Sequence, residues 1–182
     1  PVDPDEFERE AKRILEEVRK ECGWMYATLD TEGMTISRET VEGLAERVRQ
    51  AKSADEVKRI VEENSELMGE VQYTIWSDVF VCPNCSKEIA YWDIAVDDNA
   101  AGITDVFSCP FCGVNGLTKS DFERVWITKF DQAIDVHIRQ AKQLPVIVNY
   151  ALGKKRFNKA CDAFDLALMA KIEELVIPYP YP

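Results

Sequence analysis

Four cysteines in two pairs are the residues of this chain whose types and spacing are best suited to chemistry. Cys82 and Cys85 form one Cys-x-x-Cys pair, and Cys109 and Cys112 form the other. In such a pair, two sulfurs from one tight turn reach the same metal ion, and backbone N–H groups of the turn hydrogen-bond the thiolates. Residues 86–108 leave room for two strands and a turn, which bring the second pair back beside the first. The spacing therefore predicts one Zn²⁺ ion held by four cysteines.

The ligand set also predicts what the metal does. The alternatives to a metal site are two redox-active dithiols or reduced core cysteines, but redox pairs usually begin a helix in a strand-helix-strand unit, which this sequence does not indicate. Iron fits the same four ligands, and zinc is our expectation. Four protein thiolates leave no open coordination position, so the metal is predicted to be structural. We expect the strands between the pairs to have little core without the ion.

Glycine and serine follow the two pairs at equivalent places. A knuckle of this kind needs a residue in the left-handed backbone region after its second cysteine, where glycine is favoured. Gly113 meets this requirement after the second pair, and Ser86 is a weaker fit after the first.

The remaining reactive side chains give weaker signals. His137 is the single histidine, and most serine and cysteine hydrolases need one, so a hydrolase would depend on this residue. We interpret His137 as a structural residue, and Cys22 and Cys161 as small packed side chains. No pair of carboxylates has an apolar setting that would raise a pKa. The sequence therefore predicts no catalytic residue.

A basic run near the C-terminal end is the candidate DNA contact. Four cations fall within six residues around one phenylalanine: Lys154, Lys155, Arg156 and Lys159. Such a run is either a solvated loop before a helix or a contact to a phosphate backbone. The eight glycines form neither a GxGxxG nor a GxxxxGKS/T phosphate-binding loop.

Composition limits the class of protein. The chain has 182 residues, 46% of them apolar, which is typical of a folded globular protein. It has no apolar run of the roughly 18 to 20 residues that a membrane helix needs and no signal-peptide pattern at its start. We therefore expect a soluble, cytoplasmic protein with no membrane partner. Its formal net charge of −11 is concentrated in residues 1–70, so any binding to a polyanion must be local.

Apolar side chains at three- and four-residue intervals predict the helices. They cover residues 4–21, 38–51, 54 to about 68, and about 160–176. Asp3, Ser37 and Ser53 are the expected N-caps of the first three helices. We expect the apolar stripes of these helices to be buried by helix packing.

Alternating apolar residues predict strands in the middle of the chain and one strand near its end. They cover residues 71–81, 88–96, 103–108, 121–130 and 145–151, with a turn at 97–102. These elements predict an α+β fold in three parts. The parts are a helical segment over 1–69, a zinc-ribbon β module over 70–131, and a strand-plus-helix tail over 132–182. Pro1 and the proline-rich end at 177–182 indicate a piece of a longer protein.

Several segments together resemble one known family. They lie at residues 1–26, 73–85, 91–93, 109–113 and 145–150. The chain is similar, over nearly its whole length, to the central zinc-ribbon insertion of prokaryotic DNA methylases of the N-4/N-6 amino-methyltransferase type. The YTIWSDVFVCPxC and CGWMY blocks are the most specific parts of this resemblance.

The resemblance implies a role in DNA methylation within restriction-modification. Enzymes of that family transfer a methyl group from S-adenosylmethionine to an exocyclic amine of adenine or cytosine. Their glycine-rich cofactor site and their catalytic tetrapeptide, Asp/Asn/Ser-Pro-Pro-Tyr, do not occur in this sequence. The resemblance therefore implies a non-catalytic accessory domain, with S-adenosylmethionine bound only by the full-length parent. Only the four paired cysteines match functional residues of the family.

The resemblance implies two partners, and an alternative function involves no contact with DNA. The expected partners are the remainder of the parent methyltransferase and duplex DNA. The domain would help to hold or select the DNA, or it would dock a partner subunit. The alternative is an independent zinc-ribbon module for protein interaction, which the net charge of −11 favours.

Overall fold

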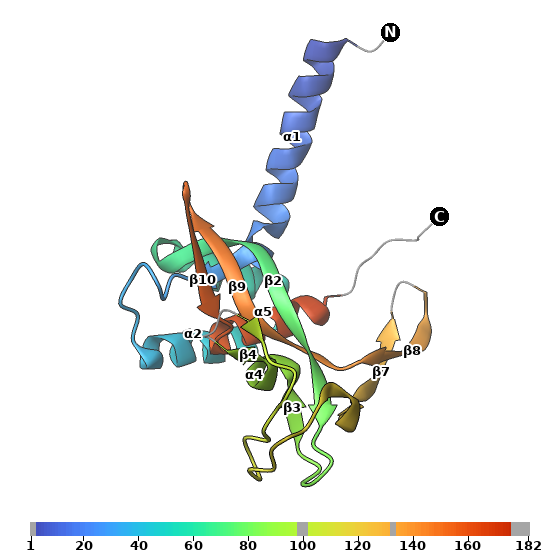
Figure 1. Cartoon of the computed structure of the whole chain (residues 1–182). Coiled ribbons are helices and arrows are strands. Elements are labelled where there is room, and N and C mark those ends of the chain that lie inside the picture. The colour runs from blue at the N-terminus through green and yellow to red at the C-terminus, as the bar shows by residue number, and fades with distance from the viewer. Residues whose placement is uncertain (1–2, 98–101, 132–133, 176–182) are drawn as a thin grey trace. The chain divides into compact units, whose positions relative to one another are not determined.

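The computed structural model describes residues 3–97, 102–131 and 134–175 (Figure 1). Helices and strands are mixed, which confirms the predicted α+β class. The chain divides into two compact units, where three segments were predicted. Unit 1 holds the described residues up to Tyr73 together with Val148–Leu175, and unit 2 holds those of Thr74–Ile147. Residues 98–101 of the predicted turn and the end at 177–182 lie outside the described residues.

Unit 1 contains the helices that the sequence predicted. They are α1 (Pro4–Cys22), α2 (Arg38–Gln50), α3 (Ala54–Glu63) and α5 (Ala163–Glu173). The side chains of Asp3, Ser37 and Ser53 each accept a hydrogen bond from a backbone N–H of the first turn, as expected of N-caps. The third helix is shorter than predicted. A 3₁₀ turn at Ser65–Leu67 follows it, and a strand begins at Met68.

The core of unit 1 lies between helices and the first strand. A short 3₁₀ turn, Gly23–Tyr26, leads into β1 (Ala27–Leu29), which pairs with the start of β2 (Met68–Val81). Helix α2 packs against α5. The fully buried side chains here include Leu29, Val48 and Phe164.

Helix α1 differs from the expectation that every apolar stripe is buried. It has no buried residue, and four large apolar side chains on it are at least half exposed: Phe7, Ile14, Leu15 and Val18. Exposed pairs such as Lys12 with Glu8 and Arg13 with Glu17 lie along its polar side. The prediction of burial is wrong for this helix, because no described residue covers its apolar stripe.

Two strands continue from one unit into the other. They are β2 and β9 (Gln143–Leu152), which are neighbours in a sheet of order β1-β2-β9-β10, where β10 is Lys155–Ala160. The predicted strands at 71–81 and 145–151 are thereby confirmed. Lys155, Arg156 and Lys159 of the basic run lie on β10 and Lys154 lies in the turn before it, so most of the run is a strand and not the solvated loop that was one of its two interpretations. Gly153, with a φ of +58°, provides the turn between β9 and β10.

Unit 2 has shorter strands than the sequence predicted. The predicted strand at 88–96 is β3 (Glu88–Ala90) followed by α4 (Tyr91–Ala95), with β4 (Val96–Asp97) after it. The predicted strand at 103–108 is reduced to β5 (Gly102–Ile103) and an isolated bridge between Phe107 and Leu117. The helical turn places Tyr91, Ile94 and Ala95 on the same hydrophobic cluster, a spacing that a strand cannot provide.

The last predicted strand of this unit is present with a break. A 3₁₀ turn at Lys119–Asp121 precedes β6 (Glu123–Arg124) and β7 (Trp126–Asp131), and β7 forms a separate hairpin with β8 (Val136–Ala141). At the break, Val125 donates its N–H to the carbonyl of Val79. None of the helices in the described ranges is long and apolar enough to cross a membrane.

Candidate metal centre

The four paired cysteines converge in unit 2, as the sequence predicted. Their sulfurs all lie within 4.8 Å of one another. The distance is 3.8 Å from Cys82 Sγ to Cys112 Sγ and 3.8 Å from Cys85 Sγ to Cys109 Sγ. A tetrahedron with Zn–S bonds of about 2.3 Å has sulfur-to-sulfur edges of about 3.8 Å, whereas a disulfide is only about 2.05 Å long. The spacing fits four free thiols around one ion.

Two turns of the same construction hold the sulfurs. The first lies between β2 and β3, where Cys82 donates its N–H to Lys87 O at 2.9 Å and accepts from Ser86 N–H at 3.0 Å. In the second, Cys109 donates to Val114 O at 2.8 Å and accepts from Gly113 N–H at 3.0 Å. Two copies of one knuckle therefore face each other.

Backbone and side-chain donors tune the thiols. Burial raises the pKa of Cys82, but the N–H groups of Cys85 and Asn84 outweigh it, so this pKa lies below its ordinary value. The amide of Asn84 and the N–H of Val114 lower the pKa of Cys112 to about 6. These donors favour thiolates, the form that binds metal.

Cys85 differs from its neighbours. The N–H of Lys87 lowers its pKa, but burial and the three surrounding thiols raise it, and the pKa lies at about 11. Four thiolates placed this close repel one another, so they need a cation among them.

Asn84 is a site residue that sequence reasoning missed. It lies in the first knuckle, and its Nδ2 donates to Cys112 Sγ of the second knuckle at 3.4 Å. A second link between the knuckles is the contact of Lys87 Nζ with the Phe111 ring, 4.9 Å from its centroid. Asn84 lies inside the first Cys-x-x-Cys pair, and Lys87 follows that pair by two residues. Their position beside the cysteines was the signal in the sequence that could have identified them as site residues.

A cluster of four aromatic side chains packs together with the buried cysteines of the two knuckles. Neighbouring ring centroids are 5.5 to 6.3 Å apart in the cycle Phe80, Tyr91, Phe107 and Phe122. Cys82 and Cys109 are buried in the same cluster. The contacts of Tyr91 and Phe107 with other rings of this cluster explain why neither residue lies in a continuous strand. Packing of aromatic rings stabilises this arrangement.

The basic run does not form a single surface. Along β10, Lys155, Phe157 and Lys159 share one face and Arg156 lies on the other, because side chains alternate in a strand. Phe157 stacks on Tyr150, with ring centroids 5.5 Å apart. Lys154, Lys155 and Arg156 are exposed.

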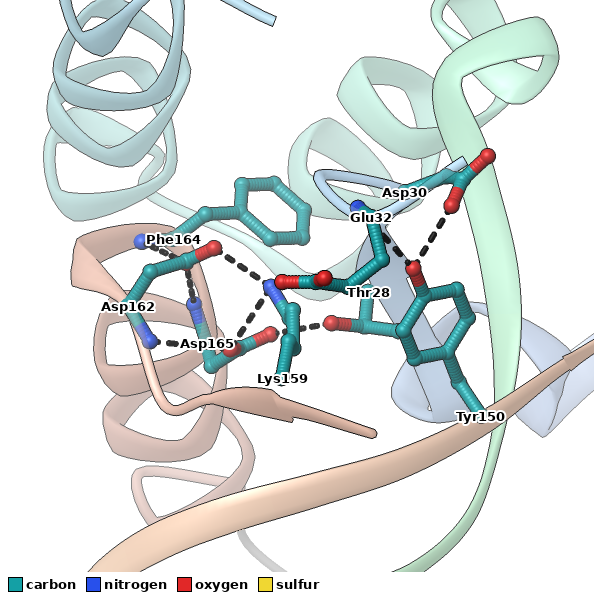
Figure 2. A network of polar contacts seen from close by, with 8 residues as sticks. All are labelled: Thr28, Asp30, Glu32, Tyr150, Lys159, Asp162, Phe164 and Asp165. Carbon is teal, nitrogen blue, oxygen red and sulfur yellow. Dashed lines mark hydrogen bonds and ion pairs between the residues drawn. The ribbon is translucent and has the colours of Figure 1, made fainter. Parts of the chain in front are cut away.

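Lys159 is not available to a phosphate, which corrects its place in the candidate DNA contact. Its side chain is 1% exposed, and Nζ forms ion pairs with Asp162 and, at 2.9 Å, with Asp165 (Figure 2). Both carboxylates also form a capping box at the start of α5. An Asp-x-x-Asp capping box three residues after a lysine was the signal in the sequence for this pairing.

The same figure shows two further buried contacts in unit 1. Thr28 Oγ1 donates to Asp165 Oδ1 at 2.5 Å, and Tyr150 OH donates to Asp30 Oδ1 at 2.6 Å. Burial raises the pKa of Asp165, although the ion pair with Lys159 opposes the shift. These groups join β1 and the sheet to α5 and are closed to solvent, so we assign them to structure.

The other reactive side chains have no catalytic setting in the described residues. His137 lies exposed on β8 with its ring 5.1 Å from that of Phe130, and no described serine, threonine or cysteine is hydrogen-bonded to it. Burial, followed by the charges of Asp165 and Asp162, raises the pKa of Cys161 to about 12, which keeps that thiol neutral.

Comparisons with models of known protein families, with curated proteins and with solved structures find no match to this chain.

Proposed function

We propose that this chain is a zinc-binding, non-catalytic accessory region of a DNA methyltransferase. The observation that carries the zinc assignment is the convergence of Cys82, Cys85, Cys109 and Cys112 at the spacing of a tetrahedral site. With four thiolates as ligands, the ion takes no water and has a structural role. It locks the two knuckles together above the aromatic ring cluster.

The methyltransferase assignment is supported by the resemblance of residues 21–26 and 73–85 to the zinc-ribbon insertion of that family. Transfer of a methyl group from S-adenosylmethionine to adenine N6 or cytosine N4 belongs to the parent enzyme. This chain alone is expected to transfer none.

The part played in that enzyme is to help hold DNA. Lys154 in the turn between β9 and β10 and Lys155 and Arg156 at the start of β10 are exposed to solvent. Because Lys155 and Arg156 point to opposite faces of the strand, they are suited to contact phosphates and not to read base edges.

Metal analysis tests the zinc assignment. We expect one equivalent of zinc in the purified chain and loss of that zinc in Cys109→Ser. Cys22→Ser is the matched control, because it makes the same change outside the cluster and should keep the metal. A folded, metal-free chain, or oxidised cysteine pairs, would refute the assignment.

Binding to a short duplex at increasing salt tests the DNA role. Replacing Lys154, Lys155 and Arg156 by Glu should weaken binding and reduce the slope of log affinity against log salt, because fewer counterions are released. The matched control reverses three other exposed cations: Arg49, Lys52 and Arg59. Absence of duplex binding at low salt would remove the DNA role.

A second candidate, an interaction module without DNA contact, is favoured by a separate observation. Helix α1 exposes Phe7, Ile14, Leu15 and Val18, and the whole chain carries a net charge of −11. An exposed apolar stripe of this kind is typical of a helix that docks a protein partner. Replacing Ile14 and Leu15 by Ser should then abolish partner binding and leave the zinc in place.

A further inference from the structure

The hairpin of β7 and β8 has a face that combines exposed aromatic rings with an arginine. In its register, Trp126 pairs with Ala141, Thr128 with Arg139, and Phe130 with His137. Paired residues of antiparallel strands point to the same side, as do alternate residues along one strand. We call this side the aromatic face; its members are Trp126, Thr128, Phe130, His137, Arg139 and Ala141.

The rings on the aromatic face are open to solvent. Trp126 is 47% exposed and Phe130 is 44% exposed. They are four residues apart on one strand, which places them about 13 Å apart at a rise of about 3.3 Å per residue. The opposite face of the hairpin is also open, with Ile127 and Val136 exposed. A two-stranded hairpin without a core of its own is expected to gain stability from a ligand or partner.

The one cation of the aromatic face, Arg139, complements a polyanion. The guanidinium of Arg139 lies 4.8 Å above the Trp126 ring, and the imidazole of His137 lies 5.1 Å from the Phe130 ring. The face carries no carboxylate, since Asp131 alternates to the other face and Asp135 precedes β8. A guanidinium held over an indole by a cation–π contact can still use its N–H donors to bind a phosphate.

We propose that the aromatic face binds unpaired bases of DNA. Trp126 and Phe130 each stack on a base of one strand, and Arg139 contacts a phosphate of that strand. Stacking of this kind accepts any base, because every base has a π face. The inference rests on the DNA role proposed above and names its contact. An enzyme that turns its target base out of the duplex leaves unpaired bases, which such a face can hold.

Binding of the whole zinc-loaded chain to a thymidine oligonucleotide tests the proposal. For an oligonucleotide of about ten nucleotides, Trp126→Leu and Phe130→Leu should each weaken binding about tenfold. Trp126→Tyr keeps a ring and should retain most of the affinity. Trp76→Leu is the matched control, because Trp76 is also 47% exposed but lies on β2, and it should bind like the unsubstituted chain.

A second measurement keeps the test independent of folding. The chain has four tryptophans, so its indole N–H groups give four NMR signals that single substitutions assign. The oligonucleotide should shift the Trp126 signal and leave that of the buried Trp24 in place. If the chain binds the oligonucleotide and the NMR signal of the Trp126 indole N–H does not shift, the proposal is overturned.

The outcomes separate this proposal from the DNA role itself. If the chain binds DNA with equal strength after Trp126→Leu and Phe130→Leu, the proposal fails and the DNA role stands. If it binds neither single-stranded nor duplex DNA at low salt, both fail. Preference for duplex over single strands, or self-association that Trp126→Leu abolishes, would also overturn the proposal, because the face would then serve another partner.

Discussion

Ser86 and Gly113 occupy the same place in the two knuckles. Each donates its N–H to the carbonyl of the first cysteine of its pair at 3.0 Å, and their φ angles are +58° and +72°. The left-handed region disfavours a residue with a Cβ by about 1 to 2 kcal/mol. The first knuckle therefore stores backbone strain that the second avoids.

The two positions should respond oppositely to substitution. We expect Ser86→Gly to raise the free energy of unfolding by about 1 kcal/mol and Gly113→Ala to lower it by about 1 kcal/mol. The second effect is conformational and not steric, because a Cβ added at Gly113 meets nothing within 4 Å. Denaturant unfolding of the metal-loaded chain measures both. Ser86→Ala is the control and should change the free energy of unfolding little. Equal effects of the three substitutions would show that the left-handed backbone is not strained at Ser86.

The contact between Asn84 and Cys112 should contribute to metal affinity. Removing a hydrogen-bond donor to a ligand commonly weakens metal binding by about tenfold or more. Asn84→Ala removes the donor that lies 3.4 Å from Cys112 Sγ and helps to lower the pKa of that thiol. We therefore expect about tenfold weaker zinc binding in competition with a chelator. Asn115→Ala, just after the second knuckle, provides the control, and equal affinities of the two variants would show that the contact is unimportant.

Local signals in the sequence were sufficient where the chemistry is local. The cysteine pairs and the N-caps Asp3, Ser37 and Ser53 each depend on a few neighbouring residues, and all lie where predicted. The neighbours of Tyr91 favour extended structure, so the sequence predicts a strand at this residue. Its helical turn follows from contacts with Phe80 and Phe107, which lie far away in the sequence.

Burial of a charge could not be predicted from the basic run alone. Lys159 resembles its neighbours Lys155 and Arg156 within the run, and the carboxylates that distinguish it, Asp162 and Asp165, lie outside the run. Likewise, the apolar stripe of α1 predicted a buried face, and nothing in the periodicity of a helix shows whether the rest of the chain covers it.

Metal removal should unfold the knuckles and leave the core of unit 1 intact. The cluster around Phe80 and Phe107 includes two of the four paired cysteines, whereas the cluster around Leu29 and Phe164 includes no residue of unit 2. A chelator should therefore speed amide hydrogen exchange near Phe80 and Phe107 but not near Leu29 or Phe164. Zinc added back should restore protection. Simultaneous loss of protection in both clusters would show that the ion supports the whole fold.

Removing the buried cation Lys159 should cost far more stability than removing its exposed neighbour Lys155. Lys159→Met removes the cation and leaves Asp165, whose side chain is 2% exposed, without its charged partner. Breaking one side of a buried ion pair costs about 3 to 5 kcal/mol, because the remaining charge stays out of water. Lys155→Met changes the same atoms on the same face of β10 but in solvent, and should cost less than about 0.5 kcal/mol. Urea unfolding of the two variants measures the difference. Equal stabilities of the two variants would mean that Asp165 is protonated or hydrated in the folded chain without Lys159. The hydrogen bond from Thr28 to Asp165 Oδ1 would then be sufficient to stabilise this side chain.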